Sequence, residues 1–198
     1  MRLSAIKILF FILLLSSWQI HAYNITRISS RNGLSNSEIL SINKDSEGMM
    51  WFGTCDGLNM FNGIKVQVYK PSSDNNNLSG NLIEKIIETE PGVFWIYTNY
   101  GLNRFDKWRK TVDHFNDFKG KYFICKSTDN DIYIIKNDNR ISYYDKKEKS
   151  FKNIDVKGIE FDRLLNFTID SNNVLWLFDC YGHIKNYSVN KGKNNNIE

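Results

Sequence analysis

Residues 34–61 read LSNSEILSINKDSEGMMWFGTCDGLNMF, and residues 78–105 read LSGNLIEKIIETEPGVFWIYTNYGLNRF. The two stretches align without a gap at a constant offset of 44 positions. Matching positions include the opening Leu-Ser, the tryptophans Trp51 and Trp95, a Gly-Leu-Asn triplet and the closing phenylalanine. Self-similarity at such a period is typical of a protein built from stacked repeats.

Two more divergent copies follow. Tyr133 takes the tryptophan position in the third copy and Trp176 takes it in the fourth, so the four anchors are spaced 44, 38 and 43 residues apart. In these later copies the next aromatic ring, Tyr144 or Tyr187, comes 11 positions after the anchor, compared with 10 in the first two copies. A period near 40 residues with several short strands indicates β-propeller blades.

The first copy divides into four strands, predicted over 39–44, 49–54, 58–61 and 65–69. Glycine, asparagine and aspartate separate them, at Asp45-Ser-Glu-Gly48 and at the hairpin signal Asn62-Gly63. The second copy repeats the plan, with strands over 93–98 and 111–115. Each copy is thus a four-stranded antiparallel meander, which buries both faces only by packing against neighbouring blades.

We therefore predict an all-β protein with about four propeller blades. The blades span 33–76, 77–119, 120–157 and 158–198, and the last lacks a complete outer strand. Residues 23–32 hold a further strand, over 23–28, in the position of a ring-closing outer strand. We expect one set of recurring residues to be structural and to pack within or between blades: Trp51, Gly57, Leu58, Trp95, Gly101, Leu102, Tyr133 and Trp176.

The first 22 residues have the pattern of a secretory signal peptide. Arg2 and Lys7 provide a positive start, residues 8–15 are an unbroken apolar run, and cleavage is expected after Ala22. The apolar run is too short for an ordinary transmembrane helix. A buried core helix and an uncleaved anchor are the alternatives for this segment.

Composition excludes several classes of function. Lys and Arg number 26 against 22 acidic residues, and no stretch concentrates them, so nucleic acid is not an expected partner. The three cysteines, Cys55, Cys125 and Cys180, lie far apart without a CxxC motif, which argues against zinc. We expect three small, partly buried thiols, and we predict neither a metal nor a cofactor.

Catalytic motifs are also missing from the pattern. His114 and His183 fall on predicted strands, where a lone histidine is usually structural, and no nucleophile–base arrangement accompanies them. Acidic and amide runs occur at 129–131, 137–139 and 170–173, all at predicted hairpin turns. Asn and Asp suit the backbone of such turns, so turn formation is a better reading than calcium binding. We predict no catalytic residue in this chain.

Ligand-binding residues should differ from blade to blade, whereas packing residues recur. The turns between second and third strands do differ, and tyrosine there can stack on a sugar while polar side chains bond its hydroxyl groups. The predicted ligand-binding residues are Asp56, Asn99, Tyr100, Asp138 and Tyr181. Trp108 departs from the repeat and is a second candidate for a contact surface.

The first copy resembles a known repeat family. Gly33-Leu-Ser, the turn Asp45-Ser-Glu-Gly48, Trp51-Phe-Gly-Thr54 and Asp56-Gly-Leu-Asn59 are similar to the two-component regulator propeller repeat. The resemblance is strong over residues 23–106 and fades over 107–190, where the third copy loses both the tryptophan and the glycine turn.

That resemblance implies the periplasmic sensor region of a hybrid two-component histidine kinase. Such propellers usually have seven blades, sense oligosaccharides and switch on polysaccharide-utilisation genes. The implied partners are a glycan or other small ligand, further blades and sensor domains of the same receptor, and a second receptor copy in a homodimer. We thus expect an incomplete seven-bladed propeller at the N-terminus of a longer receptor.

Three alternatives remain open at this point. The first is a stand-alone secreted propeller whose four-bladed ring is closed by residues 23–28. The second is a propeller lyase or glycosidase, which needs paired carboxylates or a metal-bound histidine set facing the central channel. The third is a truncated product without a function.

Overall fold

The computed structural model describes residues 25, 27–72, 77–118 and 120–189. Within these ranges the chain forms 15 β-strands and two single-turn 3-10 helices, η1 (Ser30–Asn32) and η2 (Phe161–Arg163). The all-β prediction is therefore confirmed. The predicted signal peptide and the predicted last strand of the fourth blade lie outside the described residues.

The strands form four sheets, each an antiparallel meander in which neighbours in sequence are neighbours in the sheet. Blade 1 contains β1 (Ile39–Lys44), β2 (Met50–Thr54), β3 (Gly57–Phe61) and β4 (Val66–Tyr69). Blade 2 contains β5 (Ile83–Glu90), β6 (Val93–Thr98), β7 (Gly101–Asp106) and β8 (Thr111–Phe115). Blade 3 contains β9 (Tyr122–Lys126), β10 (Ile132–Lys136), β11 (Ile141–Asp145) and β12 (Ser150–Ile154). Blade 4 contains β13 (Leu164–Ile169), β14 (Val174–Asp179) and β15 (Ile184–Ser188).

These bounds follow the sequence pattern closely. The strands predicted over 93–98 and 111–115 are β6 and β8 with the same limits. The strand predicted over 23–28 is the exception, because its described residues Ile25, Arg27 and Ile28 belong to no strand and Ile25 is exposed. Residues 23, 24 and 26 of that segment lie outside the described part of the chain.

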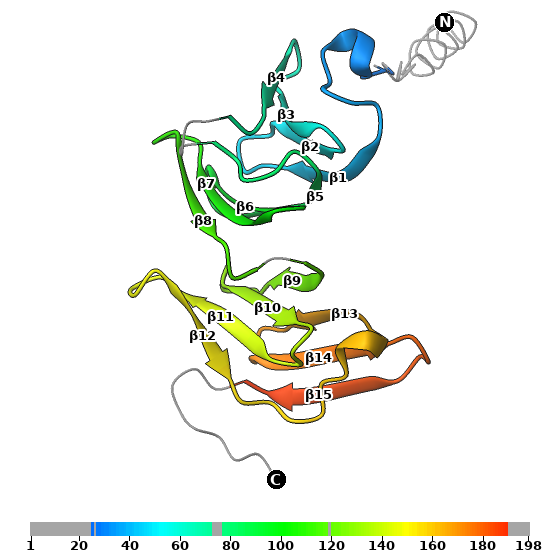
Figure 1. The fold of residues 1–198 in the computed structure, drawn as a ribbon, viewed down its shortest axis with the longest axis vertical. Coiled ribbons are helices and arrows are strands. Elements are labelled where there is room, and N and C mark those ends of the chain that lie inside the picture. Colours follow the sequence, from blue (N-terminus) through cyan, green and yellow to red (C-terminus); the bar gives the residue numbers. More distant parts are fainter. Residues whose placement is uncertain (1–24, 26, 73–76, 119, 190–198) are drawn as a thin grey trace, which may run out of the picture.

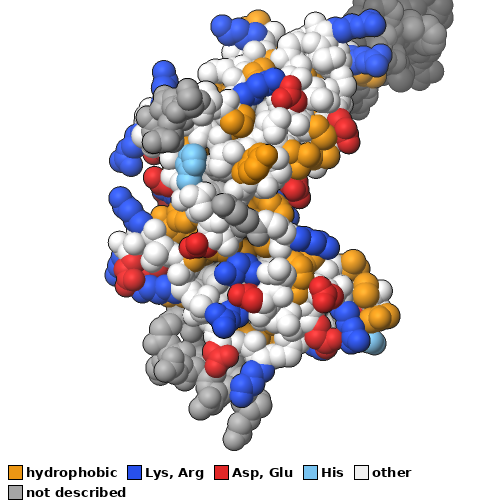
Figure 2. All heavy atoms as spheres, viewed as in Figure 1, with side chains coloured by type: hydrophobic (Ala, Val, Ile, Leu, Met, Phe, Trp, Pro, Cys, Tyr) orange, Lys and Arg blue, Asp and Glu red, His pale blue; other side chains and the backbone are white. Residues whose placement is uncertain are grey.

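The blades stack in chain order along an open arc (Figure 1). The first strands of successive blades, β1, β5, β9 and β13, contact one another along it. Blades 1 and 4 lie at opposite ends of the arc, so the four sheets do not close into a ring (Figure 1). The space-filling view shows a notch between the first two and the last two blades (Figure 2). The described fold thus departs from the closed four-bladed alternative.

Each seam between blades holds one cluster of buried apolar side chains. At the first seam, the fully buried Trp51 lies 4.4 Å from Phe94 between ring centroids. At the second, Trp95 lies 4.7 Å from Tyr144. Tyr133 is buried at the third seam. At these three positions the recurring ring packs between blades.

The two ends of the arc expose residues that the internal seams bury. Ile42 on β1 is 60% exposed, whereas its repeat partner Ile86 on β5 is 5% exposed. At the other end, Ile184 on β15 is 59% exposed, whereas its partner Ile141 on β11 is fully buried. Trp176 on the same end is only partly buried. The end faces of blades 1 and 4 thus expose apolar residues like those on one side of a seam. We call each of these two faces a half-seam.

Candidate ligand-binding face

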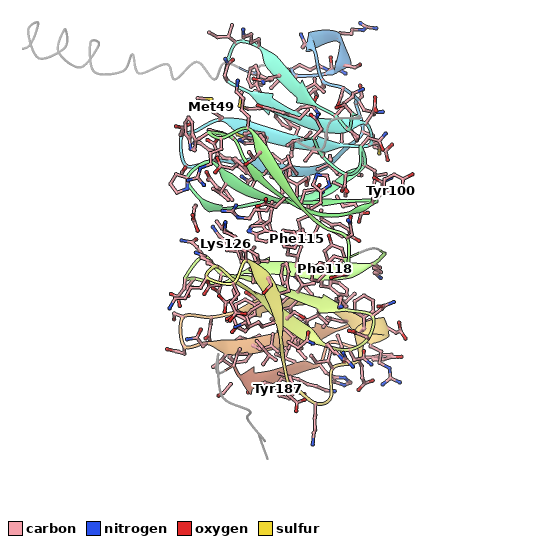
Figure 3. The ribbon with its side chains drawn as sticks, turned by 60° about the vertical axis from the view of Figure 1, so that its left-hand side comes forward. Met49, Tyr100, Phe115, Phe118, Lys126 and Tyr187 are labelled. Carbon is pink, nitrogen blue, oxygen red and sulfur yellow. The ribbon has the colours of Figure 1, made fainter. Side chains whose placement is uncertain are left out.

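The meander topology sorts the connections onto two opposite edges of the blades. We call the edge with the β2–β3, β6–β7, β10–β11 and β14–β15 turns the turn face. The opposite edge, with the first hairpin of every blade and the β3–β4, β7–β8 and β11–β12 hairpins, is the hairpin face. Figure 3 shows Tyr100 on one side of the molecule and Met49 and Lys126 on the other. All five predicted ligand-binding residues belong to the turn face.

Asp56 and Asn99 are brought together through the segment that links blades 1 and 2. Asp56 accepts hydrogen bonds from Lys70 Nζ at 2.6 Å and from Asn81 Nδ2 at 3.4 Å. Its bond from Lys70 holds the pKa of the Asp56 carboxyl below the ordinary value. Asn99 Oδ1 accepts a hydrogen bond from the backbone N–H of Leu82, the residue after Asn81. The Asp56 carboxylate and the Asn99 Oδ1 atom therefore make structural contacts.

The other three predicted residues stand apart from this pair. Asp138 caps its own turn by accepting from the Arg140 N–H, and its carboxylate lies 3.7 Å from Lys136 Nζ. Tyr100 and Tyr181 are 62% and 66% exposed, so their rings are free to meet a ligand from solvent. The Arg163 guanidinium lies 5.6 Å from the centroid of the Tyr181 ring. The turn face is thus a shallow surface with two accessible rings.

A repeated backbone hydrogen bond fixes the turns on this face. In three blades the first turn residue donates its N–H to the carbonyl of the residue just before the blade's first strand. The pairs are Cys55 to Glu38, Asn99 to Leu82, and Cys180 to Arg163. The accessible tyrosines therefore follow backbone that is tied to the blade.

Sequence reasoning missed a network of side-chain hydrogen bonds, called the lock below. This network explains most of the residues that the first two repeats share. Asn59 accepts the Ser35 N–H at 2.8 Å and donates to the Ser35 hydroxyl at 2.8 Å. Thr54 Oγ1 donates to the Gly57 carbonyl and lies 2.9 Å from the Ser35 hydroxyl. Blade 2 repeats every one of these contacts with Ser79, Thr98, Gly101 and Asn103. The shared Leu-Ser, Thr and Gly-Leu-Asn residues therefore stabilise the blades.

We expect Asn59→Ala to lower the free energy of unfolding by about 1–3 kcal/mol. Asn59 is fully buried, and its removal leaves the Ser35 N–H and the Phe52 and Gly57 carbonyls without this partner. Urea denaturation measures the change. Asn172→Ala, at an exposed position of the β13–β14 turn, is the control and should change the free energy of unfolding by about 0.5 kcal/mol or less. Equal effects of the two changes would contradict the lock.

A second structural device, in blades 1 and 4, joins the aspartate of the first hairpin to the tryptophan of the following strand. Asp45 accepts from Trp51 Nε1 at 2.9 Å and from Lys107 Nζ at 3.1 Å. Asp170 accepts from Trp176 Nε1 at 2.9 Å in the same way. Burial of Asp45 opposes ionisation, but the bonds from Trp51, Lys107 and the backbone outweigh it and hold the pKa of this carboxyl below 3.8.

This lowered pKa has a consequence for stability. The folded pKa of Asp45 lies below its unfolded value, so ionised Asp45 stabilises the fold above about pH 4, and this contribution is lost as pH falls through the folded pKa. We expect Asp45→Asn to be less stable than the wild type near neutral pH. The difference should shrink as pH falls below about 4 in a urea-denaturation series. A difference that stays constant with pH would contradict this role.

Several smaller predictions can now be compared with the structure. Asn130, Asn139 and Asn173 adopt φ values of 61°, 61° and 58°, which confirms the turn interpretation of the acidic and amide runs. Among the described residues no cluster of three or more metal-ligating side chains occurs. Cys55 and Cys125 are half-buried as expected, but Cys180, at the β14–β15 turn, is exposed.

Trp108 is exposed, as predicted, and lies on the hairpin face. Its Nε1 donates to the Pro91 carbonyl at 3.1 Å. A Cβ added to Gly92 would lie 2.2 Å from the same nitrogen, so glycine is required where the indole crosses the turn. His183 lies 3.0 Å from an Asp179 oxygen within its own turn.

The hairpin face holds two adjoining cavities that sequence reasoning did not anticipate. They lie between blades 2 and 3 and measure about 400 and 470 Å³. Asp113, Tyr144 and Lys149 line both of them. Repeat alignment could not find this site, because its walls come from strands and hairpins of two different blades.

Comparison with known proteins agrees with this geometry. Residues 33–56, from the start of blade 1 to its β2–β3 turn, match the family model described as two component regulator propeller. Blade 1 contains a two-component regulator propeller repeat. The matched stretch contains Ser35 and Thr54 of the lock and the Asp45–Trp51 bond, so the family signature coincides with the two structural devices of the blade.

Solved structures support the propeller fold. The chain is similar to the extracellular domain assigned to the hybrid two-component system BT3049 from B. thetaiotaomicron, with 23% identity, 84% of this chain and 25% of that chain covered, and a TM-score of 0.69. It is also similar to the extracellular domain of BT4673 from the same organism, with 20% identity and a TM-score of 0.63. That match covers 85% of this chain and 24% of the BT4673 chain. Virginiamycin B lyase from Staphylococcus aureus is similar with 14% identity and a TM-score of 0.54. That match covers 79% of this chain and 57% of the lyase chain.

This chain therefore spans about a quarter of the length of the two extracellular domains that it matches. A search of curated proteins found no match. In the part of the chain that the structure describes, no helix is long and apolar enough to cross a membrane.

Proposed function

We propose that the chain is part of the ligand-sensing propeller of an extracytoplasmic two-component receptor. The family match in blade 1 supports this proposal, as do the similar extracellular domains of hybrid two-component systems. In this function the chain acts by binding rather than by catalysis, and the histidine kinase lies elsewhere in the receptor. Export by the predicted signal peptide places the propeller in the periplasm.

The observation that carries the proposal is the pair of half-seams at the ends of the arc. Ile42 and Ile184 occupy positions that are buried wherever two blades meet, yet both are more than half exposed. Apolar residues exposed at corresponding positions mark surfaces that pack against a partner. Further blades of the same receptor, up to a ring of seven, are the partner we propose for these faces.

The ligand we propose is an oligosaccharide that meets the turn face. Tyr100 and Tyr181 present accessible rings there, and a sugar ring stacks on such a surface through its C–H groups. Polar side chains beside these rings, including Asn99, offer hydrogen bonds to hydroxyl groups. Ligand binding on this face then regulates polysaccharide-utilisation genes through the kinase.

The experiment is a screen of the exported chain against a panel of plant and host oligosaccharides. Thermal shift identifies candidates, and calorimetry measures their affinity. We expect Tyr100→Ala to weaken binding of a neutral oligosaccharide by about tenfold or more. Trp108→Ala, an exposed ring on the opposite face, is the matched control and should leave the affinity unchanged. Equal losses for both variants would contradict binding at the turn face.

The same screen tests the enzymatic alternative. A lyase or glycosidase would convert a bound oligosaccharide to products during incubation, which chromatography detects. Recovery of the intact oligosaccharide after prolonged incubation is the result expected for a sensor. Turnover would overturn the sensing proposal in favour of catalysis.

A further inference from the structure

The two cavities on the hairpin face form one groove between blades 2 and 3, and this groove does not depend on the proposed sensing function. One wall is blade 2, with β8 and the β7–β8 hairpin, and the other is blade 3, with the β11–β12 hairpin. Trp95, Ile132 and Tyr144 form an almost fully buried floor. A volume of about 400 Å³ in the deeper part is within the range that small-molecule sites occupy.

The charges on the two walls differ. The blade 3 wall contributes the cations Lys146 and Lys149 together with the neutral Asn130, and it contributes no acidic residue. The blade 2 wall contributes three acidic residues, Glu90, Asp106 and Asp113, and two arginines, Arg104 and Arg109. Figure 2 shows basic and acidic side chains side by side along the edge where these blades meet.

Every acidic residue of the groove already has a cationic neighbour. Arg104 lies 3.3 Å from Asp113, and Lys146 reaches across the groove to Glu90 at 3.1 Å. Asp106 accepts the backbone N–H groups of its own hairpin and lies 3.7 Å from the Arg109 guanidinium. These pairs leave the groove with little negative charge to offer a cation.

Lys149 is the cation of the groove that has no acidic partner among the described residues. It forms no ion pair and no hydrogen bond with any residue that the structure describes. Arg109, across the groove, is 79% exposed and has only the long contact to Asp106. An excess of positive charge beside an apolar floor attracts anions, and the exposed positions of Lys149 and Arg109 make that attraction dependent on salt.

The hairpin backbone fixes where Lys149 lies. Asp145 accepts the Lys147 and Glu148 N–H groups, and Lys149 follows them with φ of 51°. The β7–β8 hairpin has the same construction, since Asp106 caps it and Lys110 has φ of 54°. Lys110 does not line either cavity. The chain thus offers two lysines in matching backbone positions, one inside the groove and one outside.

We propose that the groove between blades 2 and 3 binds a small molecule through a carboxylate or sulfate group, with Lys149 and Arg109 as its cationic ligands. Carboxylate and sulfate share the chemistry that both side chains recognise, and an arginine fork pairs with either through two N–H groups. The remaining polar groups of the walls, such as Asn130 and Thr111, are available to hydroxyl groups of the same molecule.

The test is calorimetry on the whole chain with four probes: glucose, glucuronate, glucose 6-sulfate and inorganic sulfate. Glucuronate or glucose 6-sulfate should bind with a dissociation constant below about 1 mM, and glucose should not bind. Their ratio tells carboxylate from sulfate, and inorganic sulfate shows how much the charge alone contributes. Failure of all three anions at about 10 mM overturns the proposal.

The matched variants are Lys149→Asn and Lys110→Asn. Asparagine accepts the left-handed backbone at both positions, so both variants should keep the fold. Lys149→Asn should weaken binding of the anionic probe by about tenfold or more, and Lys110→Asn by about twofold or less. Equal losses would show a diffuse charge effect and overturn the site. Arg109→Gln, at a solvent-exposed side chain, gives an independent second variant with the same expected loss.

Neutral oligosaccharide binding at the turn face provides the distinction from the proposed function. Lys149→Asn should leave that binding unchanged, because the two faces lie at opposite ends of the strands. A variant that lost both ligands would instead indicate a loss of folded protein.

Discussion

Replacement of Trp51 by alanine should lower the free energy of unfolding by about 3–5 kcal/mol. The ring is fully buried at the first seam and packs against Phe94, Phe105 and Tyr69. Its loss leaves a cavity there and also removes the Nε1 bond to Asp45. The remaining Lys107 ammonium group would then be the main side-chain partner of a buried carboxylate. Urea denaturation followed by circular dichroism measures the change.

Two companion variants separate packing from hydrogen bonding. Trp51→Phe keeps most of the ring but loses the bond to Asp45, so its loss should be smaller than that of the alanine variant. Trp108→Ala removes an exposed indole and should cost about 1 kcal/mol or less. A Trp51→Ala protein as stable as Trp108→Ala would mean that the first seam does not hold the blades together.

A large contrast between repeat partners is expected for Ile86 and Ile42. Ile86→Ala should cost about 2–5 kcal/mol, because Ile86 is buried in the cluster of the first seam. Ile42 occupies the corresponding position of blade 1 and is mostly exposed. Ile42→Ala should therefore change the free energy of unfolding by about 0.5 kcal/mol or less. Urea denaturation of both variants, at one protein concentration, tests the difference.

Both possible results for Ile42 are informative. A small cost confirms that the end face of blade 1 is free in the isolated chain. A cost close to that of Ile86→Ala would show that something covers the face in solution. Sedimentation at several protein concentrations would then identify a second copy, because its association would disappear on dilution.

Much of this fold could be predicted because its signal is repeated. Trp51 and Trp95 recur at one offset, and a position present in every blade is explained best by packing between blades. Asn130, Asn139 and Asn173 could likewise be assigned to turns, since local backbone chemistry decides them.

The candidate sites could be predicted only in part. Sequence reasoning located the turn face through variation between blades, and Tyr100 and Tyr181 are indeed exposed there. It could not show that Asp56 is held by Lys70, because that contact depends on how the outer strand ends. The groove around Lys149 was missed for a similar reason, since its two walls become neighbours only when separate blades pack.

In the part of the chain that the structure describes, every sheet pairs each strand only with the strand before or after it in the sequence. This affects the order in which the protein folds. Such local pairing keeps the entropy cost of closing each loop small. A blade can therefore form as soon as its own segment has left the ribosome. Its seam remains unfinished until the next strands arrive, so Trp51 stays without Phe94 and Phe105 until blade 2 forms. During synthesis, the newest blade is therefore the one most exposed to aggregation and to proteases.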